Sequence, residues 1–185
     1  MSAFKFKDVV NEAISELIER GCAKGVLNPP RFINPLHVVQ QSGGKCRLIL
    51  DLSYFNSFIW KQYLWFEDIR TVFDLFHSGY FFFTFDLKSG YLHVGIFPDH
   101  RQYLGFSWNF SSVVKYFVFT VLLFGVSFAP YIFSIIVHSL VNYWGSLGRR
   151  VVTFLITVLA GAPITLVAWS IVVYVGLIWS LRVSL

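Results

Sequence analysis

The sequence predicts an α+β fold that closes with an apolar helix long enough to span a membrane. Three observations lead to this prediction. Residues 8–20 repeat apolar side chains at helical spacing, and short runs typical of strands follow between residues 37 and 97. From Val151 to Leu181 the chain carries 31 residues without a formal charge, which exceeds the ~20 apolar residues that a transmembrane helix needs.

The composition indicates unusually deep burial or contact with lipid. Of the 185 residues, 56% are hydrophobic and 14% are charged, whereas ordinary soluble domains carry about 25% charged residues. The net charge of +5 suits a polyanionic partner such as nucleic acid, and it suits an anionic membrane surface equally well. The length is enough for one domain with a core, or for a piece of a larger one.

The cysteines and the start of the chain give no sign of secretion. Cys22 and Cys46 have neither zinc-ligand spacing nor the density of a disulfide framework. The first ten residues contain two lysines and an aspartate, where a signal peptide needs an apolar stretch. The default expectation is an intracellular protein in a reducing compartment, unless the run at 151–181 inserts into a membrane.

A helix and a hairpin are predicted in the first third of the chain. Residues 8–20 form an amphipathic helix, with acidic residues early, an arginine last, and Gly21 after it. Residues 37–52, HVVQQSGGKCRLILDL, have the pattern of a strand, a Ser-Gly-Gly turn and a second strand. This hairpin carries Lys45 and Arg47 on its second arm.

Two short strands are predicted in the middle of the chain. Residues 80–86 form an apolar run typical of a buried strand that ends on an acid, and residues 92–97 form a second strand before Pro98. The strand end leaves Asp86 as an isolated carboxylate. Taken alone, Asp86 is better explained as a cap for the turn at residues 88–90.

The two longest uncharged runs have different explanations. The first spans 22 residues from Tyr116 to Val137, and Gly125 and Pro130 interrupt it. A loop and a helix in a protein core explain it at least as well as a membrane span does. The second run, 151–181, has no such explanation, so a membrane-seeking helix is expected there.

Four strings occur in the order that a known family uses. They are KCRLILDL followed by Asn56, then FDLKSGY, then HRQYLGFSW, and then VLLFGVSFAPYIFS. Together they resemble the reverse transcriptase domain of retrotransposons, most closely the DIRS-like and Gypsy-like groups, over roughly residues 8–152. The resemblance implies the fingers and part of the palm of a right-hand polymerase, and a primer-template and deoxynucleotides as partners.

The resemblance assigns roles to individual residues. Asp86 matches the family's first metal-binding aspartate, which helps to hold two Mg²⁺ ions, and Leu87 offers its backbone carbonyl beside it. Tyr91 takes the place of the steric gate under the incoming sugar. A plain core tyrosine is the alternative explanation.

Four more residues belong to the implied nucleotide pocket. Lys45 and Arg47 lie where the triphosphate is held, and an exposed, solvated hairpin face is the alternative. Phe124 and Gly125 match the loop that backs the nucleotide. In that loop Phe128 replaces a small serine of the family pattern.

The second half of the catalytic site is missing. The family carries a Tyr/Phe-Leu-Asp-Asp-Gly hairpin about 70 residues after the first aspartate, and this chain reads Phe-Leu-Ile-Thr-Val at 154–158. Ile156 and Thr157 thus replace the two acids. The prediction is a partial reverse transcriptase domain over 1–152 and an unrelated apolar tail over 153–185. A frameshift, a splice error and point decay remain alternative origins.

Three classes of function follow. The first is a catalytically inactive remnant of an RNA-directed DNA polymerase, for which a bound metal pair is doubtful. The second is a nucleic-acid-binding remnant without chemistry, and the third is a small membrane protein with one or two spans at 116–137 and 151–181. His93 and His100 have no partner at metal-ligand spacing and are expected to be ordinary histidines.

Overall fold

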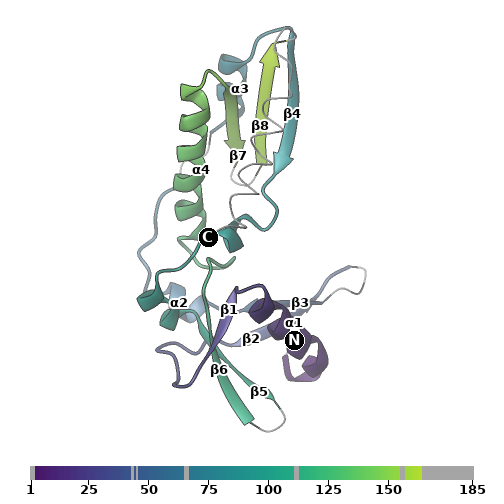
Figure 1. The fold of residues 1–185 in the computed structure, drawn as a ribbon, viewed down its shortest axis with the longest axis vertical. Helices are drawn as coiled ribbons and strands as arrows, with labels where there is room; N and C mark the ends of the chain where they lie inside the picture. The colour runs from purple at the N-terminus through teal and green to yellow at the C-terminus, as the bar shows by residue number, and fades with distance from the viewer. Residues whose placement is uncertain are drawn as a thin grey trace. The chain divides into compact units, whose positions relative to one another are not determined.

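The chain forms two compact units, each built from two segments of the sequence. The computed structural model describes residues 3–42, 44, 46–64, 67–110, 113–154 and 157–163. The first unit holds Met1–Tyr63 and Ser89–Ile132, and the second holds Leu64–Lys88 and Phe133–Leu185. Helices combine with three small antiparallel sheets (Figure 1), so the predicted α+β class is confirmed.

The first unit contains a three-stranded sheet, a two-stranded hairpin and short helices. Its strands are β1 (Ala23–Val26), β2 (Leu36–Gln40), β3 (Cys46–Leu50), β5 (Gly105–Phe110) and β6 (Val113–Phe119). Its helices are η1 (Ala3–Phe6), α1 (Lys7–Glu19), α2 (Ser53–Asn56), η2 (Gly90–His93) and η3 (Pro98–Tyr103). The sheet has the order β1-β6-β5, and β2 pairs with β3.

The helix and the hairpin predicted near the N-terminus are confirmed. Helix α1 differs from the predicted range by one residue at each end, and it buries Val10 and Ile14 on its apolar face. It stops before Gly21, whose φ of +67° is a left-handed conformation that favours glycine. In the hairpin, Val39 of β2 lies opposite Arg47 of β3.

Aromatic packing and close backbone contacts hold the larger sheet of the first unit. The Phe106 ring is fully buried and stacks on Phe117 with 5.2 Å between the ring centroids. Gly105 allows a backbone approach that no side chain permits, since an added Cβ would lie 2.3 Å from Pro30 Cγ. Asn34, also buried, donates through Nδ2 to the carbonyl oxygens of Tyr103 and Gly105 at 3.1 and 3.0 Å.

The second unit is a three-stranded antiparallel sheet with helices beside it (Figure 1). Its elements are α3 (Ile69–Leu75), β4 (Tyr80–Asp86), β7 (Arg150–Phe154), β8 (Thr157–Pro163) and α4 (Ala129–Ser146), whose first residues belong to the first unit. The strand order is β4-β8-β7. Its core joins α4 to one face of the sheet and includes Trp144, Val151, Val158 and Ala160.

The Phe76 ring packs closely on the opposite face of this sheet. Phe76 follows α3 and contacts Phe82 of β4 edge-to-face, with 5.1 Å between the ring centroids. Gly161 of β8 lies under this ring, since an added Cβ would come within 2.7 Å of a Phe76 ring carbon. A glycine is therefore required at 161 for Phe76 to pack this closely.

Two predictions for the middle of the chain need correction. Strand β4 forms as predicted, but it is not buried, because Phe81 and Phe82 keep 65% and 52% of their surface exposed. Residues 92–97 do not form a strand. The chain turns as the 3₁₀ helix η2, and Gly95 makes an isolated bridge with Val121.

The prediction of membrane-length helices is wrong for the described residues. The run 116–137 divides into the end of β6, a loop and the start of α4. The run 151–181 begins with β7 and β8, because β4 supplies a partner strand that satisfies the backbone of β8. Residues 164–181 lie outside the described residues. None of the helices in the described part of the chain has both the length and the apolar character that a membrane crossing needs.

Candidate functional site

Asp86 ends β4 directly opposite the first residue of β8. The antiparallel register pairs Asp86 with Thr157, and Thr157 pairs in turn with Phe154 of β7. The Thr157 hydroxyl donates a hydrogen bond of 2.6 Å to Asp86 Oδ1. The exposed carboxylate therefore lies beside the point where the end of β7 pairs with the start of β8. Leu155 and Ile156, which come between these strands in the sequence, lie outside the described residues.

This donor set does not fit a pair of Mg²⁺ ions. Mg²⁺ prefers near-octahedral oxygen coordination with carboxylates, and a metal pair needs several of them to offset its charge. Asp86 supplies one carboxylate, and one of its oxygens already accepts the Thr157 hydroxyl. Within the described ranges, no three His, Cys, Asp or Glu side chains gather as a metal-binding group.

The loop with Phe124 and Gly125 is held by a side chain of the same unit. Gly125 has a φ of +97°, a conformation that favours glycine. Asn56, the last residue of α2, donates through Nδ2 to the Gly125 carbonyl at 2.7 Å. It also accepts the Ser127 N–H at Oδ1, at 3.0 Å. Both polar atoms of one amide thus fix this turn.

Tyr91 lies against Phe124 in the first unit. Their ring centroids are 4.4 Å apart, and the planes meet at 63°. Tyr91 is 3% exposed whereas Phe124 is 61% exposed, and burial raises the pKa of the Tyr91 phenol. The structure therefore brings Tyr91, Phe124 and Gly125 together, with the tyrosine as the buried member. As arranged here, its ring is not open to a sugar.

The other predicted pocket residues are spread over both units. Arg47 is exposed on β3 in the first unit, so its guanidinium is available to an anion. Lys45 lies outside the described residues. Leu87 is half-buried and follows Asp86 in the second unit. The roles assigned to these residues remain predictions.

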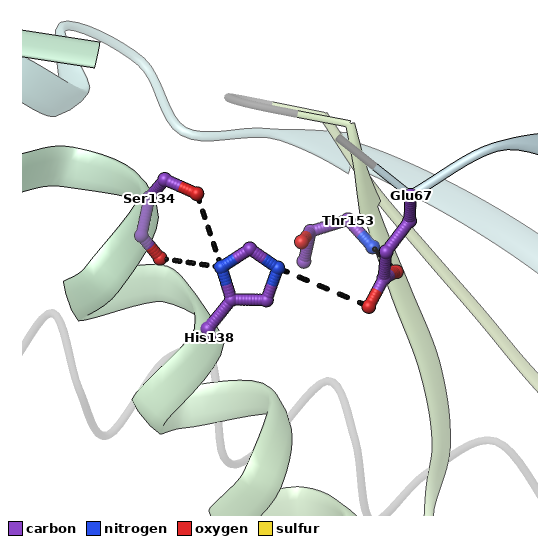
Figure 2. A network of polar contacts seen from close by, with 4 residues as sticks. All are labelled: Glu67, Ser134, His138 and Thr153. Atoms are coloured by element: carbon purple, nitrogen blue, oxygen red, sulfur yellow. Dashed lines mark hydrogen bonds and ion pairs between the residues drawn. The ribbon is translucent and has the colours of Figure 1, made fainter. Parts of the chain in front are cut away.

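The second unit also contains a polar network that the sequence did not reveal (Figure 2). His138 of α4 receives two contacts at Nδ1 from Ser134, 2.8 Å from its carbonyl oxygen and 3.0 Å from its hydroxyl. Its Nε2 lies 3.9 Å from Glu67 Oε1, and Glu67 Oε2 accepts the N–H of Thr153 in β7 at 3.1 Å. The spacing of Ser134 and His138 at i and i+4 was the one available sequence signal.

This network has a structural role rather than a catalytic arrangement. Ser134 is only 7% exposed. Its hydroxyl and its carbonyl oxygen both contact the same nitrogen, Nδ1 of His138. A nucleophile needs an accessible oxygen and a base committed to it. Glu67 instead supplies the acceptor for a backbone N–H of the outer strand β7.

No protein-family model and no curated protein matches this chain. The family resemblance therefore depends on the four sequence strings and on the position of the residues within them.

Proposed function

We propose that this chain is a catalytically inactive remnant of an RNA-directed DNA polymerase from a retroelement, with parts of the fingers and palm. One observation carries most of the weight. The sequence motif assigns Thr157 to a position where the family has a catalytic acid, and the strand register places Thr157 opposite Asp86. The motif and the strand pairing thus point to the same two residues.

The secondary structure around Asp86 supports the same proposal. A palm active site needs a strand that ends on an aspartate and a neighbouring hairpin whose turn presents further acids. Here β4 ends on Asp86, and the β7–β8 hairpin pairs with β4 along seven register positions from Tyr80 to Asp86. The hairpin is thus retained, while its acids are replaced.

The loss of chemistry follows from electrostatics. Phosphoryl transfer to a primer hydroxyl develops negative charge that two fixed cations must offset, and carboxylates hold those cations. With one carboxylate and a neutral hydroxyl at the paired positions, the site lacks the charge to hold them. The buried Tyr91 ring is a second departure from an open nucleotide pocket.

Primer extension tests this function. The purified full chain, given an RNA or DNA template, a labelled primer, deoxynucleotides and Mg²⁺ or Mn²⁺, is expected to show no product above background. Asp86→Asn is the matched control, since it removes the remaining carboxylate with little change in shape. Extension that disappears in Asp86→Asn would refute the inactive assignment, because it requires other acids to complete the site.

A further inference from the structure

The first unit contains an aromatic cavity that is distinct from the candidate nucleotide site. Its volume is ≈ 620 Å³, within the range of about 300–1,000 Å³ that is typical of small-molecule sites. Phe32, Phe55, Phe58 and Tyr103 are among its lining residues. None of Tyr91, Phe124 and Gly125 lines it.

The aromatic side chains form a connected set of rings. Phe32 meets Phe55 and Phe58 edge-to-face, with 5.5 and 5.9 Å between ring centroids. Phe55 in turn stacks on Tyr103 at 6.2 Å, with an angle of 19° between the planes. Phe58 is 64% exposed, so much of its surface is accessible to solvent. A planar aromatic ligand can pack against such rings by offset stacking or by edge-to-face contact.

Among the described residues that line the cavity, Arg31 is the one with a formal charge. The Arg31 guanidinium lies 5.7 Å from the centroid of the Tyr103 ring, and His100 also lines the cavity. No carboxylate is among the lining residues of the described chain. An arginine that is exposed, stacked on an aromatic ring and unopposed by an acid favours an anionic group on the ligand.

Phe128 connects this cavity to the departure from the family pattern. It replaces a small polar residue of the resembling sequences, and its side chain lines the cavity. The substitution therefore adds apolar, aromatic wall to a place where a serine would offer a small hydroxyl.

We propose that this cavity binds a small planar aromatic molecule that carries one anionic group, such as an aromatic sulfonate or carboxylate. The rings hold the planar body by stacking and apolar contact, and Arg31 pairs with the anion at the polar side. The ligand class follows from the aromatic lining, the volume and the sign of the charge. It does not depend on the polymerase ancestry.

A pair of fluorescent probes tests both parts of the proposal. The purified full chain in detergent-free buffer is titrated with 8-anilinonaphthalene-1-sulfonate and, separately, with N-phenyl-1-naphthylamine, which has the same rings without the sulfonate. Saturable binding of the sulfonate with a stoichiometry near one is expected. Phe58→Ala should weaken both probes about tenfold, because it removes an exposed ring from the cavity.

The charge variant separates the two contributions. Arg31→Gln should weaken the sulfonate about two- to fivefold, as expected for an exposed ion pair, and leave the neutral probe unchanged. Trp60→Ala and Arg70→Gln are the matched controls, because both side chains are exposed and neither lines the cavity. Neither control should change the affinity of either probe.

Two results would overturn the proposal. One is binding at many weak positions that neither Phe58→Ala nor Arg31→Gln changes, which indicates general exposed apolar surface. The other is wild-type affinity in both Phe58→Ala and Phe128→Ser, because the probe then lies elsewhere. Far-UV circular dichroism of each variant checks that a loss of binding does not arise from a loss of fold.

Discussion

At the scale of single residues, the side chain at position 157 determines whether Asp86 has a second carboxylate beside it to bind a metal ion. Because the two residues are directly paired across β4 and β8, Thr157→Asp places two carboxylates side by side. Like charges at directly opposed strand positions repel, so this variant should be less stable than wild type without metal. Millimolar Mn²⁺ should restore stability, since a cation between the carboxylates binds the folded state preferentially.

Thermal unfolding with and without Mn²⁺ measures this effect. The melting temperature of Thr157→Asp should rise with Mn²⁺, while wild type and the uncharged Thr157→Asn should stay unchanged. The double variant Asp86→Asn with Thr157→Asp should lose the response. A response that survives in the double variant would place the ion elsewhere and remove the support for a decayed metal site.

Tyr91 gives a second residue-level prediction, on pH. Burial raises the pKa of the Tyr91 phenol above its ordinary value of 10.0, so the folded state keeps the phenol neutral where the unfolded chain ionises it. This contribution to stability is fully present below the unfolded pKa and is lost as the pH rises through the folded pKa. The free energy of unfolding should therefore fall above about pH 10.

Urea unfolding at several alkaline pH values tests this dependence. Tyr91→Phe should make the decline with pH shallower, because the group that titrates is gone. Tyr54→Phe, at a tyrosine that is 69% exposed, is the control and should leave the decline unchanged. Equal slopes for wild type and Tyr91→Phe would contradict the assignment of the titration to Tyr91.

At the scale of elements, Glu67 accepts a backbone hydrogen bond from an outer strand of the sheet in the second unit. Strand β7 is one of the two outer strands of the sheet β4-β8-β7, and its buried residue Thr153 donates its N–H to Glu67 Oε2. Glu67→Ala leaves this buried donor without its acceptor, which should cost about 1–3 kcal/mol of unfolding free energy. Glu67→Gln keeps an acceptor oxygen and should cost less.

Chemical denaturation with secondary structure as the readout measures both variants. Asp74→Ala provides the control, since it removes an exposed acid from the neighbouring helix α3. If Glu67→Ala and Asp74→Ala have the same small effect, the carboxylate does not protect the strand edge. A loss in Glu67→Gln as large as in Glu67→Ala would point to the charge facing His138 rather than to the backbone acceptor.

Local patterns predicted some elements well and others poorly. Helix α1 and the β2–β3 hairpin were predictable, because an apolar helical face and a Ser-Gly-Gly turn are encoded within short windows. Strands β7 and β8 were not, because an uncharged run satisfies a membrane helix and a paired strand equally well. What decides between them is the partner β4, about 70 residues earlier in the sequence.

The candidate site shows the same division. The position of Asp86 at a strand end followed from the apolar run before it, and the loss of acids at 156–157 was visible directly. The hydrogen bonds from Asn56 to the Gly125 turn link α2 to a loop 69 positions later. No local sequence pattern predicts a contact over this separation. The burial of Tyr91 likewise depends on packing that spacing alone does not encode.

At the scale of the whole molecule, each unit depends on segments that are far apart in the sequence. The second unit takes β4 from residues 80–86 and its remaining strands from residues 150–163. A chain that ends at Arg150 would therefore lose β8, which supplies the described pairing of β4. The apolar run after residue 150 thus contributes structure, at least up to residue 163.

The charge of the whole chain supports a last prediction, that it binds nucleic acid without acting on it. The net charge is +5 and Arg47 is exposed on β3, so contacts to phosphate are expected to dominate any binding. The affinity for a labelled primer-template, measured by fluorescence anisotropy, should fall steeply between about 50 and 200 mM salt. Arg47→Gln should reduce the slope of log affinity against log salt by about one, the share of one released counterion.

Arg20→Gln serves as the control, because Arg20 is already paired with Glu16 at 2.5 Å and should change the slope less. An affinity that does not depend on salt would contradict phosphate-led binding, and it would leave the apolar surface of the chain as the source of the contact.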